Sequence, residues 1–214
     1  MRVLKYGMSI IILLFVSLCI YESYLLKQAQ DKTPEIRERF LNGHEVIWSD
    51  MPKHRLEMLL KVEDPNFYNH DGVDFQTPGA GLTTITQGLT KFMYFDDFRP
   101  GFKKIEQTLI AKFVLDKQFT KDEQLSIFLN HAYLGGFEGK GIRGFQKASE
   151  VYFGTDLINL SDEQYLSLVA MLVAPNALHI KKSPEKNAQR VKRIEMVLDG
   201  LYVPKDLTDI FYDR

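Results

Sequence analysis

Residues 63–74 read Glu63-Asp64-Pro65-Asn66-Phe67-Tyr68-Asn69-His70-Asp71-Gly72-Val73-Asp74. This stretch places an acidic pair, an aromatic ring, a histidine and a glycine-framed aspartate at fixed spacing. Just before it, leucines at 56, 59 and 60 recur at helical spacing, so Glu63 is expected at the end of an amphipathic helix. Pro65 fits a break at that point, because a proline disfavours helical backbone in the residue before it.

A run of hydroxyl and amide side chains follows, Thr83-Thr84-Ile85-Thr86-Gln87. The two stretches together read E-D-x-x-F-x-x-H-x-G-x-D and G-x-T-T-I-T-Q. This combination resembles the first two motifs of the family-51 glycosyltransferases, enzymes that polymerise lipid II into peptidoglycan glycan strands. By propensity alone, residues 83–92 could form either a helix or a strand.

Three later regions extend the resemblance in the family's order. They are Lys103-Lys104-Ile105-Glu106 opening a long helical pattern, Phe128-Leu129-Asn130 closing another, and Gly141 to Gly144 leading to Tyr152-Phe153-Gly154. The likeness spans roughly residues 50–201. It implies a mainly α, lysozyme-like helical glycosyltransferase domain, and Gly72, Asp74 and Asn130 are expected to be structural positions of its motifs.

The chain also departs from the family pattern. Only Phe75 to Ala80 separate Asp74 from Gly81, which implies a reduced small lobe. In the third region the family's R-K-x-x-E becomes Lys103-Lys104-Ile105-Glu106-Gln107, so a glutamine stands where the second glutamate belongs. Counting back from Asp116 puts Thr108 there instead, which indicates a one-residue register shift. Glu106 is the nearest carboxylate and is the candidate for a second catalytic glutamate.

The N-terminus predicts a membrane anchor. Arg2 and Lys5 precede a charge-free run at 8–21, and apolar residues resume after Glu22. The resulting length approaches the 20 or so residues that a bilayer core requires. We therefore expect residues 1–7 in the cytoplasm, a transmembrane signal anchor at 8–26, a linker and lead-in at 27–48, and the catalytic domain at 49–214. A cleavable signal peptide and a buried core helix are the alternatives; no good small-x-small cleavage site follows the run.

Composition narrows the function classes. Among 214 residues, 27 basic and 28 acidic side chains give a net charge of −1, which offers no argument for nucleic acid binding. The single cysteine, Cys19, cannot form an internal disulfide. Capping-box patterns at 120–123 and 161–164 predict the starts of two further helices, and an apolar pattern at 187–201 predicts a last one.

Glu63 is the candidate general base. Forming a β-1,4 bond from a diphosphate donor requires the acceptor hydroxyl to lose a proton as it attacks, and a carboxylate can accept it. A surface carboxylate at a helix end is the alternative, which the motif around Glu63 disfavours. We expect Asp64 to orient or cap, and His70 to hold the loop by hydrogen bonds rather than to bind a metal, because no other histidine lies at ligand spacing.

The departing diphosphate needs cations or dipoles held in place. Arg99, Lys103 and Lys104 could supply the charge, Lys91 could join them, and the threonine run could bond sugar or phosphate oxygens. The full set expected to bind substrate is Asp64, Phe67, His70, Thr83, Thr84, Thr86, Gln87, Lys91, Arg99, Lys103 and Lys104. A Mg²⁺ or Mn²⁺ ion at the diphosphate is plausible from the family, although the sequence shows no dedicated ligand set.

The resemblance thus implies a peptidoglycan glycosyltransferase that takes lipid II and the nascent glycan strand and releases undecaprenyl diphosphate. It would sit in the inner membrane with a single pass, its domain on the periplasmic side, with a separate transpeptidase as a possible partner. Two alternatives stay open. One is a lytic transglycosylase that cleaves glycan with Glu63 as the acid, and the other is a non-enzymatic relative that binds lipid II or acts as a scaffold.

Overall fold

The computed structural model describes the backbone of residues 2–213 and the side chains of residues 6 and 8–213, so the side chains of Arg2 and Lys5 lie outside the described part. The described chain is mainly helical, which confirms the predicted class. After a long first helix, α1 (Arg2–Leu41), the domain contains α2 (Lys53–Glu63), α3 (Ile85–Met93), α4 (Phe102–Ile110), α5 (Asp116–Gln118), α6 (Lys121–His131), α7 (Phe145–Phe153), α8 (Asp162–Met171) and α9 (Pro184–Leu198). Strands β1 (Tyr133–Phe137) and β2 (Lys140–Arg143) form one antiparallel hairpin.

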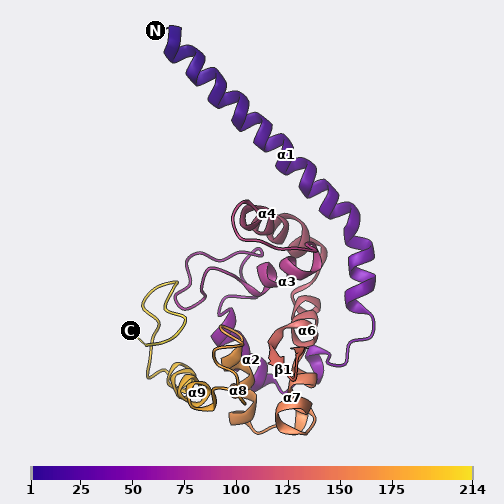
Figure 1. Ribbon diagram of the computed structural model, residues 1–214, viewed down its shortest axis with the longest axis vertical. Helices are drawn as coiled ribbons and strands as arrows, with labels where there is room; N and C mark the ends of the chain where they lie inside the picture. The colour runs from indigo at the N-terminus through magenta and orange to yellow at the C-terminus, as the bar shows by residue number, and fades with distance from the viewer. Residues whose placement is uncertain (1, 214) are drawn as a thin grey trace.

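Helix α1 combines an exposed apolar part with a part that packs on the domain. Its N-terminal portion stands clear of the domain (Figure 1), and the stretch from Met8 is long and apolar enough to cross a membrane by length and composition. Its C-terminal portion buries Ala29, Ile36 and Phe40 against the domain. The linker expected at 27–48 is therefore helical as far as Leu41, because apolar residues recur on one face of this otherwise polar segment.

Polar contacts hold the C-terminal portion of α1 on the domain. The guanidinium of Arg37 donates to both carboxylate oxygens of Glu123, at 2.6 and 3.1 Å, and Thr33 shares a 2.9 Å hydrogen bond with Tyr94. Two parallel bonds from one guanidinium specify geometry better than a single contact does. The exposed apolar stretch of α1 and the rest of the domain are thus joined by a continuous, well-anchored helical segment.

The core lies among α2, α6, α7, α8 and α9, and it determines where α2 ends. Leu59 is fully buried and Val62 nearly so, which places the last turn of α2 against the core. Arg55, a buried cation on the same helix, donates to Asp162 at 3.0 Å and to the Leu157 carbonyl at 3.2 Å. These contacts hold α2 on the start of α8, and the end of α2 therefore has a fixed position.

Three capping boxes begin helices in the described chain. They join Thr84 with Gln87, Thr120 with Glu123, and Ser161 with Gln164. The last two confirm the sequence prediction. The first shows that the threonine run begins a helix rather than a strand, because its side chains satisfy backbone groups that a helix start leaves unpaired.

The long helix predicted from Phe102 contains a π-helical turn, η2, at Ala111–Leu115 before it continues as α5. A π turn accommodates one extra residue within an α-helix. This turn lies between Gln107 and Asp116, the two reference points of the predicted register shift. The extra residue is thus absorbed within the helix rather than in a loop.

Candidate active site around Glu63

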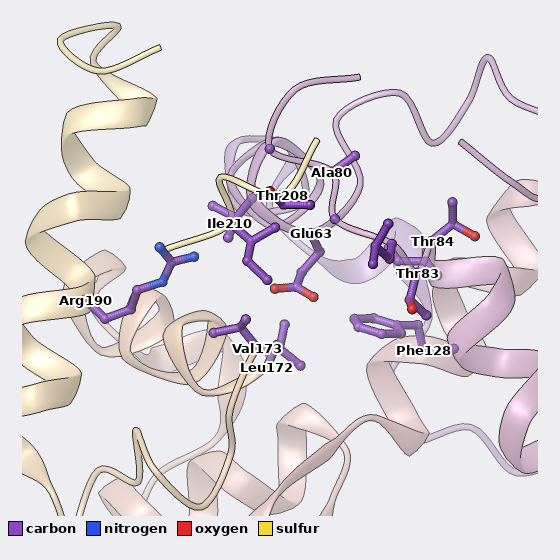
Figure 2. A pocket seen from close by; sticks show the side chains of 16 residues that line it. Glu63, Ala80, Thr83, Thr84, Phe128, Leu172, Val173, Arg190, Thr208 and Ile210 are labelled. Carbon is purple, nitrogen blue, oxygen red and sulfur yellow. The ribbon is translucent and has the colours of Figure 1, made fainter. Parts of the chain in front are cut away.

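Glu63, the last residue of α2, projects into a cavity of about 440 Å³. Figure 2 shows its carboxylate between Leu172 and Val173 on one side and Ile210 on the other, with Phe128 at one flank. These walls are largely apolar. Figure 2 and the lining residues therefore place the carboxylate of the half-buried Glu63 in a pocket rather than on the open surface.

A second cavity, of about 640 Å³, meets the first at Glu63. The two share Glu63, Gly88, Phe128 and Leu172, and the second continues past Lys91 and other residues. The shared lining makes the two cavities one groove with Glu63 near its middle. Such a shape can hold two substrate portions with the carboxylate between them.

The surroundings of Glu63 make it a stronger base than an ordinary glutamate. Burial raises the pKa of the Glu63 carboxyl to about 7; the nearby Arg190 charge opposes this shift, and the adjacent Asp64 adds to it. A general base works best when its pKa lies near the operating pH. The apolar cavity therefore brings the pKa of Glu63 close to neutral pH.

Arg190 on α9 is a site residue that sequence reasoning missed. It lines the first cavity and is only 3% exposed, and no described residue forms a hydrogen bond with its Nε or Nη1. Its guanidinium lies over the Tyr212 ring, 4.3 Å from the centroid. The sequence does contain a pattern that could have identified Arg190. It occupies the same helical face as the apolar Val191 and Ile194, where an isolated charge is unusual.

Lys91 and Lys104 lie beside the groove. The ammonium of Lys104 on α4 donates to the Thr83 hydroxyl at 2.8 Å, and Thr83 lines the first cavity. Partial burial and the nearby Lys91 charge lower the pKa of Lys104. Within residues 2–213, neither lysine has an ion pair with a carboxylate. Their positive charge is therefore open to an anionic ligand.

Asp64 and His70 hold the loop rather than contact the groove. Asp64 is fully buried and accepts hydrogen bonds from His70 Nε2 at 3.0 Å and from the backbone N–H of Ile85 at 2.9 Å. This aspartate thus ties the end of α2 to the start of α3. These contacts are of the orienting and capping kind expected for Asp64, and neither side chain lines the cavities at Glu63; substrate binding by the two stays a prediction.

Several other side chains of the first two motifs also have their contacts within the protein. The hydroxyl of Thr84 donates to the Gly72 carbonyl at 2.7 Å, and that of Thr86 to Gln124 at 2.7 Å. Gln87 donates to Thr108 at 3.0 Å, and Phe67 is 1% exposed in the core. Thr84, Thr86 and Gln87 are buried, whereas Thr83, whose hydroxyl accepts a hydrogen bond from Lys104, is exposed and lines the cavity.

Glu106 does not share the groove with Glu63. It lines a separate cavity against α1, together with Lys103, and accepts a 3.4 Å hydrogen bond from Tyr21. Arg99 is exposed and paired with Asp97 at 2.9 Å. The structure therefore does not bring Glu106 and Glu63 together, because the face of α4 that carries Glu106 points to α1.

Gly72, Asp74 and Asn130 are structural, as expected. Gly72 has φ +78°, and a Cβ there would lie 2.6 Å from the Ala111 carbonyl oxygen. Burial of Asp74 is outweighed by hydrogen bonds from the Thr77 hydroxyl and neighbouring backbone N–H groups, which lower its pKa to about 2. Asn130 accepts from the Val46 N–H at 3.1 Å and donates back to the Val46 carbonyl at 2.6 Å.

The described residues offer no preformed cluster of side-chain ligands for a divalent cation. Across the described residues, no three His, Cys, Asp or Glu side chains lie together as metal ligands. Mg²⁺ generally takes one or two carboxylates plus substrate phosphates. A Mg²⁺ or Mn²⁺ ion at the diphosphate stays a prediction, and its oxygen ligands would come mainly from the substrate.

Comparison with known proteins places the chain in one class. The profile of the Transglycosylase family matches residues 33–200. Penicillin-binding protein 1B of Buchnera aphidicola subsp. Acyrthosiphon pisum is 34% identical over 195 residues, covering 85% of this chain and 24% of that protein. Penicillin-binding protein 1B of Escherichia coli K12 is 30% identical over 165 residues, covering 70% and 19%. Penicillin-binding protein 1F of Bacillus subtilis is 30% identical over 162 residues, covering 70% and 22%.

The chain belongs to the Transglycosylase family, the family-51 glycosyltransferases. This membership confirms both the resemblance seen in the motifs and the lysozyme-like helical class. The chain spans about a quarter or less of the length of these curated relatives.

Residues 64–84, the loop between α2 and α3, contain no helix or strand in the described structure.

Proposed function

We propose that this protein is a peptidoglycan glycosyltransferase that polymerises lipid II into β-1,4 glycan strands, with Glu63 as the general base. The observation that carries the proposal is the position of Glu63, enclosed at the junction of two cavities with a pKa raised to about 7 by burial. Family membership supports the same reaction class.

In the proposed reaction, the 4-hydroxyl of one lipid II sugar gives its proton to Glu63 as its oxygen attacks the donor's anomeric carbon. The bond from that carbon to the diphosphate oxygen breaks, and undecaprenyl diphosphate leaves with the bonding electrons, so the anomeric configuration inverts. Lys104 and Lys91 would stabilise the charge that develops on the leaving oxygens. Thr83, bonded to Lys104, would help to orient the diphosphate.

The direct test is incubation of purified full-length protein with fluorescent lipid II in detergent or vesicles, followed by gel separation of the glycan products. We expect polymers of increasing length. Release of muropeptides from purified sacculi without polymer would instead identify a lytic enzyme. Saturable lipid II binding by folded protein with no turnover would contradict the proposal and identify a non-catalytic relative.

Lys104→Ala is expected to lower kcat/KM for lipid II by about 10- to 100-fold, because it removes a partly buried cation beside the groove. Arg99→Ala is the matched control, since Arg99 is exposed, is paired with Asp97 and lines neither cavity. Initial rates of lipid II consumption give the comparison. Equal losses in the two variants would show that general surface charge, rather than Lys104 itself, accounts for the effect.

The proposed setting is the inner membrane, with α1 as a single-pass anchor and the domain on the periplasmic side. The exposed apolar stretch of α1 supports membrane insertion. A separate transpeptidase that cross-links the resulting strands is the proposed partner. Protease accessibility of the domain in spheroplasts, compared with that in inverted vesicles, tests the orientation.

A further inference from the structure

The last described part of the chain, residues 201–213, crosses the domain beside the Glu63 cavity; we name it the C-terminal strap. It lies beyond the range that the family profile matches, which ends at residue 200. Figure 1 shows this yellow segment beside the loop that connects α2 and α3. Thr208 and Ile210 of the strap line the cavity that contains Glu63.

Backbone hydrogen bonds join the strap to that loop. The N–H of Gly79 donates to the Asp206 carbonyl at 2.9 Å, and the N–H of Gly81 donates to the Leu207 carbonyl at 2.8 Å. A Cβ built at Gly79 would lie 2.9 Å from Pro204, which shows how closely the two segments approach. Together, the strap and the loop form one wall of the cavity (Figure 2).

Tyr212 anchors the strap next to the candidate base. Its side chain is buried, its hydroxyl donates to the Val62 carbonyl at 3.2 Å, and its ring lies against Arg190. Its backbone has φ +55°, an unusual value for an aromatic residue. Strained backbone of this kind persists only where surrounding contacts enforce it. A salt bridge from Arg193 to Asp213, at 3.3 Å, adds a further attachment.

We propose that the C-terminal strap completes the active site, with Tyr212 as a positioning residue that holds Arg190 and the end of α2 in place while Ile210 keeps water from Glu63. This proposal extends the proposed function and rests on it for its catalytic meaning. Its structural content, that the strap controls the environment of Glu63, can be tested without any substrate.

The expected direction follows from the two opposing effects on Glu63. Opening the strap would hydrate the Glu63 carboxylate, which would lower its pKa. Opening would also free Arg190, whose nearby charge lowers the pKa of Glu63 in the intact protein, so this second effect would raise the pKa. Burial is the larger of the two in the intact protein. The net result of opening the strap is therefore a fall in the pKa of Glu63 toward that of an ordinary glutamate.

The experiment compares five full-length proteins and one truncation in detergent micelles. They are wild type, Tyr212→Phe, Tyr212→Ala, Ile210→Ala, Val203→Ala and a chain that stops after Gly200. Val203→Ala is the matched control, because Val203 lies in the strap but is 75% exposed and does not line the cavity. Carboxyl ¹³C titration of glutamate-labelled protein, assigned with Glu63→Gln, gives the pKa of Glu63, and lipid II turnover is measured over the same pH range.

We expect the pKa of Glu63 to fall in Tyr212→Ala, Ile210→Ala and the truncation, and to be unchanged in Val203→Ala. Tyr212→Phe should largely keep the wild-type value, because the ring on Arg190 is retained. The acid limb of kcat/KM should move to lower pH in the same variants, with a loss of about tenfold above pH 7. If the truncation does not fold, the point variants decide the result.

An unchanged Glu63 titration in both Tyr212→Ala and Ile210→Ala would overturn the proposal. The two proposals fail in different ways. If wild type titrates near 7 and Tyr212→Ala titrates lower, but neither turns over lipid II, the strap has its proposed effect and the proposed function is wrong. If wild type turns over lipid II normally and the strap variants change neither the titration nor the turnover, the proposed function stands and the proposal on the C-terminal strap is wrong.

Discussion

Glu63→Gln is expected to reduce lipid II polymerisation by about 10²- to 10⁴-fold, the range typical for loss of a general base. The amide occupies the same space but cannot accept the proton of the attacking hydroxyl. Glu106→Gln should retain most of the activity, because Glu106 lines a different cavity against α1. Polymer formation by the purified variants at pH 7.5 gives the comparison.

Folding of Glu63→Gln can be checked through its stability. Because the pKa of Glu63 is raised in the folded state, the folded protein binds more protons than the unfolded chain between about pH 4.5 and 7, and stability falls as pH rises through that range. Glu63→Gln should therefore melt at a higher temperature than wild type at pH 8 and at a similar one at pH 4. Glu57→Gln, an exposed position on the same helix, serves as the activity control. Full activity of Glu63→Gln would exclude Glu63 as the base.

Gly72→Ala is expected to destabilise the fold by about 2–5 kcal/mol, from left-handed backbone strain plus a steric clash. The added Cβ would lie 2.6 Å from the Ala111 carbonyl oxygen, where the loop after α2 meets the π turn. Thermal unfolding in detergent should show a fall in Tm of roughly 5–20 °C. Activity should fall as well, because this contact positions the loop between Glu63 and α3.

Gly154→Ala separates the two contributions. Gly154 has φ +71°, close to that of Gly72, but nothing lies within 4 Å of a Cβ built there. Gly154→Ala should therefore lose only the stability that left-handed backbone strain removes, about 1–2 kcal/mol in the free energy of unfolding. If the two alanine variants lose equal stability, the close approach to Ala111 is not a significant constraint.

Local sequence patterns predicted much of the fold. The helix ending at Glu63, the capping boxes at Thr120 and Ser161, and the apolar anchor each depend on residues close together in the chain. Such signals act within a few residues, so they can be detected without knowledge of tertiary contacts. Glu63 was identified because its motif is local in the same sense.

The features that sequence reasoning did not identify depend on contacts between residues far apart in the chain. Arg190 reaches the cavity from α9, more than a hundred residues after Glu63, and the strap is defined by its pairing with Gly79 and Gly81. Thr86 and Gln87, which the sequence groups with the substrate-binding residues, are buried by tertiary packing that local sequence does not reveal. Glu106 lies apart from Glu63 because α1 continues as a helix past residue 26 and packs along the face of α4 that carries Glu106, a contact that the polar sequence of this segment does not indicate.

The pH dependence of lipid II polymerisation is the most direct test of the central claim, that an enclosed Glu63 is the base. For wild type, we predict that kcat/KM rises about tenfold per pH unit below pH 7 and levels off above it, since only the ionised carboxylate accepts the proton. The residual rate of Glu63→Gln should lack this limb. A wild-type profile that is flat from pH 5 to 9, or whose limb is unchanged in Glu63→Gln, would contradict the claim.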